Sequence, residues 1–144
     1  MIVLDTTVLV YAVGAEHPLR GPCRSLISMI AEGRVAASTS VEVLREFAHV
    51  RARRSGRADA AELASDYARL LAPVLVCDAD DLEAGLQLFR SHGRLGAFDA
   101  VLAAMAIRRG ASGLVSADGG FDAIAGLSWL DPAAADFVTR LGPG

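Results

Sequence analysis

The stretch MIVLDTTVLVYAV, residues 1–13, decides the fold class. Residues 2–4 form a short apolar run that Asp5 follows directly, and Thr6 or Thr7 can cap the apolar segment that comes next. Because this stretch has no basic leader and carries Asp5 within its apolar part, we interpret it as a buried strand followed by a helix rather than as a secretion signal. Asp5 is therefore expected at the carboxyl end of the first strand.

The remainder of the chain alternates short apolar runs with longer helical segments. Further strands are predicted at about residues 35–37, 74–76, 114–116 and 127–130, and helices at about residues 24–32, 40–53, 58–71, 78–90 and 95–109. This alternation predicts an α/β fold, a three-layer α/β/α sandwich whose short central sheet is mainly parallel and has helices on both faces. No repeat or linker interrupts residues 1–144, so we expect one domain.

The composition excludes several classes of protein. The net charge is −3, so the chain does not bind nucleic acid by bulk attraction, and all 14 basic residues are arginine. No apolar run reaches the roughly 18 residues that a membrane span requires, so no membrane association is expected. Cys23 and Cys77 match neither a zinc-ligand spacing nor a redox pair, and we interpret them as two buried thiols of a cytoplasmic protein.

Asp99 is the most informative single residue. It lies in the segment LGAFDAVLAAMAI, residues 95–107, which is apolar nearly all the way round a helix. An ionised carboxylate surrounded by core is costly unless an arginine, a set of hydrogen-bond donors or a metal ion compensates it. Considered alone, Asp99 fits either a metal or catalytic role or a structural one, as a helix N-terminal charge or an ion pair.

Three further carboxylates lie at positions that fit a functional site. Asp5 and Asp118 each follow a predicted strand, although either could serve only as a helix cap or a turn former. Glu46 lies on the apolar margin of its predicted helix and is expected to be half-buried, with a surface ion pair as the alternative. Glu42, one turn earlier, faces the basic side of that helix, so we interpret it as part of a solvated polar face and rank Glu46 above it.

The carboxyl ends of parallel strands share one edge of a sheet, and ligands bind there. We therefore expect four carboxylates to converge at this edge, namely Asp5, Glu46, Asp99 and Asp118. Like charges gather closely only when cations neutralise them, and hard oxygen ligands suit Mg²⁺ or Mn²⁺. Such an ion can hold a phosphate and activate water, so the predicted reaction is phosphodiester hydrolysis.

Four ordered blocks of the sequence resemble those of PIN-domain nucleases, and more narrowly those of the VapC-type toxins of bacterial toxin–antitoxin pairs. The blocks are IVLDTTVLVYA with Asp5, SVEVLREF with Glu46, GAFDAVLAAMA with Asp99, and LVSADGGFD with Ser116 and Asp118. The resemblance covers nearly the whole chain. It places the catalytic and metal-binding acids of the family at Asp5, Glu46, Asp99 and Asp118.

The resemblance implies a Mg²⁺- or Mn²⁺-dependent endoribonuclease toxin that forms a homodimer. Such a toxin would inhibit translation by cutting a structured RNA, such as transfer or ribosomal RNA. A cognate VapB-type antitoxin would wrap the toxin and place a basic side chain in the acidic pocket.

The chain departs from the family pattern in two places. Thr7 stands where many members have Asn, and its hydroxyl could supply part of the same hydrogen bonding to a metal ligand, as could Ser116. Gly119, Gly120 and Phe121 separate Asp118 from the next acid, whereas many members have an acid closer to it. This next acid, Asp122, is expected at most in an outer position around the metal.

Arginines are densest around the end of the helix that carries Glu46. They are Arg45, Arg51, Arg53, Arg54 and Arg57. The first four are candidates for guiding an RNA backbone toward the acids. The alternative is a solvated helix terminus whose positive charges only favour the helix dipole.

Other classes with acids at strand ends fit the sequence less well. A receiver-type phosphorylation domain requires a lysine, which the chain lacks, and a haloacid-dehalogenase-type phosphatase requires Asp where Thr7 stands. A dinucleotide-binding module requires a glycine-rich turn that the segment DTTVLV does not provide. The remaining alternative is a catalytically weakened protein of the same fold that acts mainly by binding RNA or a partner.

Overall fold

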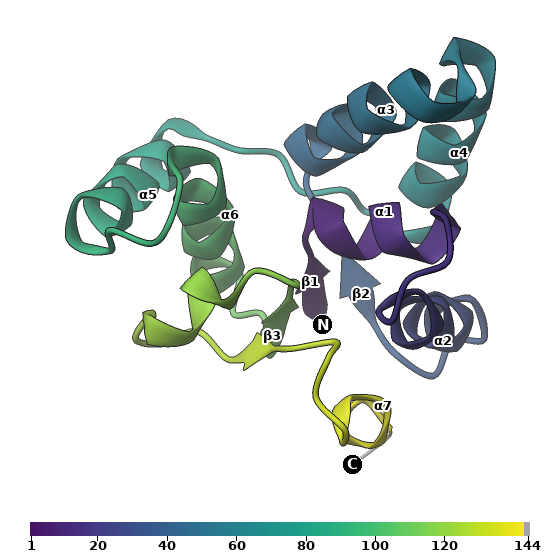
Figure 1. Ribbon diagram of the computed structural model, residues 1–144. Coiled ribbons are helices and arrows are strands. Elements are labelled where there is room, and N and C mark those ends of the chain that lie inside the picture. Colours follow the sequence, from purple (N-terminus) through teal and green to yellow (C-terminus); the bar gives the residue numbers. More distant parts are fainter. Residues whose placement is uncertain (143–144) are drawn as a thin grey trace.

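A parallel sheet forms the centre of the protein in a computed structural model that describes residues 1–142 (Figure 1). Its strands are β1 (Ile2–Leu4), β2 (Ala37–Ser38), β3 (Gly113–Val115) and β4 (Trp129–Leu130), in the order β2-β1-β3-β4. β1 is central, because Val3 pairs with Ser38 on one side and with Leu114 on the other. All neighbouring strands are parallel, as predicted, so every strand ends at the same edge of the sheet.

Helices cover the sheet on both sides. They are α1 (Thr6–Val13), α2 (Arg20–Ala31), α3 (Val41–Ser55), α4 (Arg57–Leu70), α5 (Ala79–Ser91), α6 (Ala97–Arg108) and α7 (Phe137–Arg140), with a short 3₁₀ helix at Gly119–Ala123. Helices α1 to α4 lie on one side of the sheet and α5 and α6 on the other (Figure 1), which confirms the predicted three-layer α/β/α sandwich. Among the described residues, no helix is both long and apolar enough to cross a membrane.

The central strands are apolar because helices cover both of their faces. Val3, Leu4 and Leu114 are fully buried in the core. Helix α6 packs closely against α5, since a Cβ atom added at Gly85 would lie 2.5 Å from the Cα atom of Val101. Glycine at this position therefore allows the two helices to approach one another.

The prediction of a strand at residues 74–76 is wrong. This segment makes only an isolated parallel bridge, between Leu75 and Ser40. Because β2 has already ended and α3 begins directly after Ser40, the edge of the sheet offers no further backbone groups with which a strand could pair. Val76 is accordingly 68% exposed instead of lying in the core.

The other boundaries mostly agree with the predicted ones to within about two residues, which is the usual uncertainty of helix ends. The clearest exception is α2, which begins at Arg20 instead of residue 24. Gly21 and Pro22 precede the predicted helix, but they fit the first turn of α2, where the N–H that proline lacks has no partner within the helix. Helix α7 and the 3₁₀ helix were not predicted, because a single turn is too short to display a hydrophobic period.

Candidate active site

Asp5 lies at the carboxyl end of β1, at the edge where the strands end. It caps helix α1, since its Oδ1 accepts a 2.7 Å hydrogen bond from the backbone N–H of Thr6. Its Oδ2 accepts hydrogen bonds from the hydroxyls of Ser116 at 2.7 Å and Thr7 at 3.1 Å. Asp5 is only 4% exposed, so these three donors hold a buried carboxylate in one orientation.

Thr7 and Ser116 also fix the loop that follows β3. The Ser116 hydroxyl accepts a 3.0 Å hydrogen bond from the backbone N–H of Asp118. The Thr7 hydroxyl accepts a 3.1 Å hydrogen bond from the backbone N–H of Ala117. Both hydroxyls thus have the geometry expected of groups that orient a metal-binding carboxylate, and that role for Thr7 and Ser116 stays a prediction.

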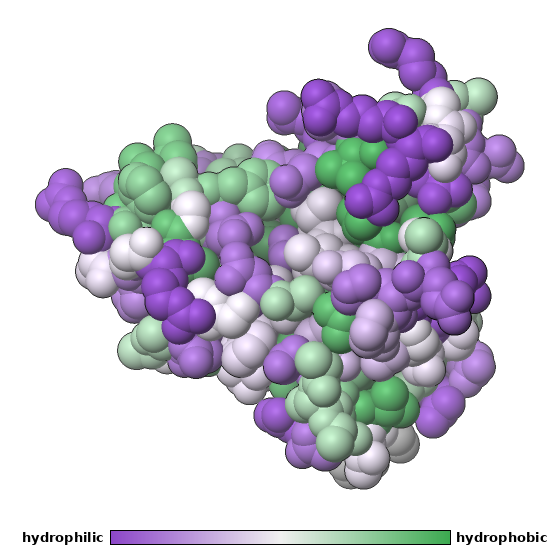
Figure 2. All heavy atoms as spheres, in the orientation of Figure 1, coloured by the Kyte–Doolittle hydropathy of each residue, from purple (hydrophilic) through white to green (hydrophobic). Residues whose placement is uncertain are grey.

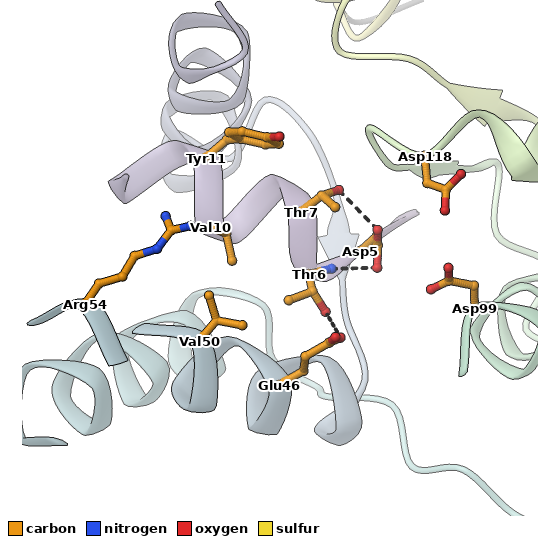
Figure 3. Close-up of a pocket in the computed structure, with 10 residues that line it drawn as sticks. All are labelled: Asp5, Thr6, Thr7, Val10, Tyr11, Glu46, Val50, Arg54, Asp99 and Asp118. Carbon is orange, nitrogen blue, oxygen red and sulfur yellow. Dashed lines mark hydrogen bonds between the residues drawn. The ribbon is translucent and has the colours of Figure 1, made fainter. Parts of the chain in front are cut away.

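Asp118 lies on this loop and points toward Asp5 and Asp99 (Figure 3). Its Oδ1 accepts a 2.9 Å hydrogen bond from the backbone N–H of Gly120 at the start of the 3₁₀ helix. A Cβ atom added at Gly120 would lie 3.0 Å from the carbonyl oxygen of Arg94 and 3.2 Å from Oδ1 of Asp118. The glycine that departs from the family pattern therefore leaves room for Asp118 in its present position.

Asp99 lies in the first turn of α6. The apolar pattern predicted that core residues would enclose Asp99. The side chain is instead half-buried, because this turn lies at the rim of the sheet. Burial is the main cause that raises the pKa of Asp99 to about 7, and the negative charges of Asp5, Asp118 and Glu46 are the further causes. The site therefore concentrates negative charge around Asp99.

Glu46 reaches the same site from α3. Its Oε2 accepts a 2.7 Å hydrogen bond from the hydroxyl of Thr6, which ties the side chain to the start of α1. We expected Glu46 to be half-buried, but it is exposed because this part of α3 borders the open side of the site. The predicted acids therefore approach one another from β1, α3, α6 and the loop after β3.

The four acids line one open pocket of about 320 Å³. Its lining residues are Asp5, Thr6, Thr7, Val10, Tyr11, Glu46, Val50, Arg54, Asp99 and Asp118 (Figure 3). Within residues 1–142, none of the four carboxylates forms an ion pair with an arginine or a histidine. Burial raises the pKa of Asp5 as well, although its hydrogen bonds from Ser116, Thr6 and Thr7 act in the opposite direction.

A divalent cation fits the chemistry of these donors. Carboxylate oxygens are hard ligands, and Mg²⁺ characteristically binds through one or two carboxylates while it keeps several of its waters. Among the described residues, no three Asp, Glu, His or Cys side chains already lie close enough to ligate one ion. A few direct ligands, with water between the ion and the other acids, therefore suit this pocket better than a complete cage of protein ligands.

The predicted arginine cluster divides in the structure. The Nε of Arg51 lies 2.6 Å from a carboxylate oxygen of Asp59, and its guanidinium also donates to a carbonyl of α1. Arg54 lines the acidic pocket, whereas Arg45 and Arg53 are exposed outside its lining. These positions separate an arginine that links three helices from one that faces the site, and the RNA contacts themselves stay predictions.

Two other acids lie outside the pocket. Asp122 is exposed, with a carboxylate oxygen 3.9 Å from Arg94, and its outer role stays a prediction. Glu42 was predicted to belong to a solvated polar face, and this prediction is wrong. One of its carboxylate oxygens is buried without a hydrogen-bond partner among the described residues. It lines a separate apolar pocket together with Cys77, which is half-buried instead of buried because it faces this open pocket.

The site predicted from the sequence omitted four of the residues that line the pocket: Thr6, Val10, Tyr11 and Val50. Helical spacing was the available signal. Val10 and Tyr11 follow the two threonines of α1 by one turn, and Val50 follows Glu46 by one turn on α3. Using this signal requires knowing that α1 and α3 lie side by side, which only the folded structure provides.

Comparison with known proteins agrees with this fold. A family model of the PIN domain matches residues 2–127. The chain therefore belongs to the PIN domain family. Within it, the chain is 50% identical to Ribonuclease VapC7 of Mycobacterium tuberculosis in an alignment that covers 99% of each chain. It is 33% identical to Ribonuclease VapC23 of the same organism over 82% of this chain and 93% of the relative.

Solved structures share the fold. The crystal structure of VapC20 of Mycobacterium tuberculosis, described as a sarcin-ricin loop cleaving toxin, superposes with a TM-score of 0.71 at 23% identity and covers 85% of this chain and 94% of that chain. VapBC2 of Rickettsia felis, bound to a DNA fragment from its promoter, gives a TM-score of 0.70 at 20% identity, with 91% and 98% coverage. The resemblance to VapC-type proteins drawn from the sequence blocks is thus confirmed.

Proposed function

We propose that this protein is a divalent-metal-dependent endoribonuclease that hydrolyses RNA phosphodiester bonds. The observation that carries the proposal is the pocket in which Asp5, Asp99 and Asp118 point toward one another without an ion pair in residues 1–142 (Figure 3). Unneutralised acids in a pocket favour a cation and, with it, phosphate chemistry. The relative that is 50% identical along the whole chain carries the name ribonuclease, which supports RNA as the substrate.

The acids that would hold Mg²⁺ or Mn²⁺ are Asp5, Glu46, Asp99 and Asp118. When bound, such an ion supplies charge stabilisation to a phosphate and makes its bound water more acidic. The hydroxyls of Thr7 and Ser116 keep Asp5 in the orientation that the site needs. Glu46 has one carboxylate oxygen on the Thr6 hydroxyl, and its other oxygen is available to accept a proton from the attacking water.

We infer further that the protein is the toxin of a toxin–antitoxin pair and acts in the cytoplasm. Structural neighbours described as a VapBC complex and as a sarcin-ricin loop cleaving toxin support this assignment. Cleavage of transfer or ribosomal RNA would inhibit translation. A VapB-type antitoxin would neutralise the toxin by placing a basic side chain among the pocket acids, where it gains ion pairs that residues 1–142 do not supply.

We also propose a homodimer, in which a second copy of the chain covers the apolar surface of α5 and α6. Figure 2 shows apolar side chains on this lobe of the molecule, and its exposed members are Leu82, Leu86, Phe89 and Phe98. Exposed apolar side chains that form one patch mark an interaction surface. Sedimentation should find a dimer for the wild type and a monomer for Leu86→Glu, and a monomeric wild type would contradict the proposal.

Binding without catalysis, the alternative, rests on the two departures from the family pattern. Thr7 retains a hydrogen bond to Asp5, and Gly120 leaves space for Asp118. Neither departure therefore removes a group that the proposed reaction needs, and catalysis is favoured.

Cleavage of RNA by the purified protein tests the proposed function. We expect cleavage with Mg²⁺ or Mn²⁺, none after chelation, and a strong loss of cleavage in Asp5→Asn and Glu46→Gln. Glu62→Gln is the matched control, because Glu62 is an exposed acid of α4 outside the pocket. Full activity in the presence of a chelator would refute the role of the metal.

A further inference from the structure

The acidic pocket continues into a groove between α1 and α3. Glu46, Val50 and Arg54 follow one another at intervals of four residues and line the α3 wall. Val10 lines the α1 wall, and Tyr11 lines the same pocket from the next face of α1 (Figure 3). We call the part formed by Val10, Tyr11, Val50 and Arg54 the α1–α3 groove. Figure 3 shows that it leads away from the aspartates, so the pocket has an acidic end and an end with a guanidinium and an aromatic ring.

Arg54 supplies a positive charge that forms no ion pair with an acid of residues 1–142. By contrast, Arg51, one turn earlier, is bound to Asp59. Its Nη1 lies 3.8 Å from where a Cβ atom of Gly14 would be, so the guanidinium reaches from α3 to the end of α1. Arg54 lies two turns, about 12 Å, beyond Glu46 along α3. It is therefore available to a phosphate other than the one at the acids.

Tyr11 supplies an aromatic surface in the same pocket. Its ring stacks on that of His17, with 4.4 Å between the centroids and an angle of 28° between the planes. The ring is half-buried, and its hydroxyl makes no hydrogen bond within the described part of the chain. A ring held in place at one face of a pocket is the feature with which proteins bind unstacked bases.

We propose that the α1–α3 groove is a substrate subsite for the nucleotide next to the cleaved bond, with Arg54 on a phosphate and Tyr11 against a base. This inference rests on the proposed function, since it explains how the proposed cleavage site would select among RNA substrates. An arginine and an aromatic ring that line one pocket are the combination that binds single-stranded nucleic acid. Bases inside an RNA duplex cannot reach Tyr11, so the subsite selects RNA that is unpaired at the cleavage point.

Binding is measured in the Asp99→Asn background, so that RNA is not cut, with a short fluorescent single-stranded RNA of mixed sequence and Mg²⁺. Arg54→Ala should weaken binding about tenfold and lower the slope of log affinity against log salt by about 0.7, because one phosphate contact is lost. Tyr11→Ala should weaken binding about fivefold or more, whereas Tyr11→Phe keeps the ring and should bind as the parent does. A perfectly paired RNA duplex should bind the parent and Tyr11→Ala equally.

Arg90→Ala is the matched control, because Arg90 is an exposed arginine on α5, across the sheet from the groove, and its removal changes the net charge equally. Equal RNA affinity of Arg54→Ala and Arg90→Ala would overturn the proposal. It would also be overturned if Arg54→Ala and Tyr11→Ala kept RNA binding but lost complex formation with a co-expressed antitoxin, since the groove would then bind a protein. Failure of the proposed function would be seen separately, as an absence of RNA cleavage by the wild-type protein with Mg²⁺ or Mn²⁺.

Discussion

Acidic side chains gather in two regions of residues 1–142, and arginines form ion pairs with them in only one of the two. The pocket acids are Asp5, Glu46, Asp99 and Asp118. The α5 acids are Asp78, Asp80 and Asp81, around the start of α5. Arg108 and Arg109, at the end of α6, contact the α5 acids, whereas no arginine is paired with a pocket acid in residues 1–142.

Asp81 demonstrates the effect of the arginines. It is fully buried, yet hydrogen bonds from Arg109, one of 2.7 Å, and from Arg108 hold the pKa of its carboxyl well below the usual range. Asp81 and Asp78 also accept hydrogen bonds from one another's backbone N–H groups, at 3.0 and 2.8 Å, and so form a capping box for α5. The α5 acids therefore fasten the start of α5 to the end of α6.

Asp99 has the opposite surroundings, and its pKa moves in the opposite direction. Burial and three like charges raise the pKa to about 7, with no arginine to compensate them in the described residues. The residue type is the same in both regions, so the difference comes from the partners. Acids whose charge the fold neutralises contribute stability, and acids whose charge it leaves unneutralised mark a site for a cation or a substrate.

Replacing Asp99 tests the pocket side of this comparison and should have the largest effect. Asp99→Asn keeps the shape of the side chain but removes the charge, so RNA cleavage should fall on the order of a thousandfold, while the melting temperature stays the same or rises. Cleavage assays and thermal unfolding of the purified variant measure both quantities. Asp136→Asn is the control, because Asp136 is exposed and makes no side-chain cap. RNA cleavage by Asp99→Asn at the wild-type rate would contradict the proposed role of Asp99 in the site.

Replacing Asp81 tests the α5 acids, the second region of the comparison. Asp81→Asn removes a buried charge from two arginines and should lower the free energy of unfolding by about 2 kcal/mol, with RNA cleavage unchanged. Urea unfolding measures the loss. Asp80→Asn is the matched control: its carboxylate is exposed and lies 3.6 Å from Arg108, so we expect a loss of about 0.5 kcal/mol. Equal losses in the two variants would contradict the structural role of Asp81.

Addition of metal should distinguish the two regions by stability alone. An ion that binds only the folded protein adds about 1.4 kcal/mol at a concentration of about ten times its Kd. Mg²⁺ or Mn²⁺ should therefore raise the melting temperature of the wild type and of Asp81→Asn, but not that of Asp99→Asn. Scanning calorimetry of the three proteins gives the answer, and an equal rise in all of them would place the ion outside the pocket.

The pH dependence of the metal-free protein should have opposite signs in the two regions. The pKa of Asp99 is about 7 in the folded state against 3.8 in the unfolded state, so the folded state binds more protons between these values and loses stability as the pH rises through them. The pKa of Asp81 is lowered on folding, so its contribution is present above about pH 4 and is lost in more acidic solution.

Melting temperatures of the wild type and the two variants check this sign. The advantage of Asp99→Asn over the wild type should grow from about pH 4 to about pH 7 and then level off. The amount by which the melting temperature of Asp81→Asn lies below that of the wild type should become smaller below about pH 4. Parallel pH profiles of all three proteins would show that neither carboxyl is shifted.

Much of the fold and the acidic site could be predicted because it depends on local patterns. Apolar runs followed by Asp5 and Asp118 indicated strand ends, and parallel strands share one edge, so the two acids were expected to meet. The strand predicted at 74–76 failed because pairing depends on what the neighbouring segment leaves available. The exposure of Glu46 could not be predicted either, since it depends on how α3 lies against α1.

Hydrophobic periods and helix caps depend on residues a few positions apart in the sequence. For that reason the sequence alone predicts the succession of strands and helices along the chain and the identity of the pocket acids. Ion pairs are different, because they depend on residues that only folding brings together. Asp81 meets Arg109 across 28 positions, and Arg51 is bound to Asp59 while Arg54 remains available to the groove. Folding alone thus decides which charges are neutralised, and with them which acids and arginines can act on a substrate.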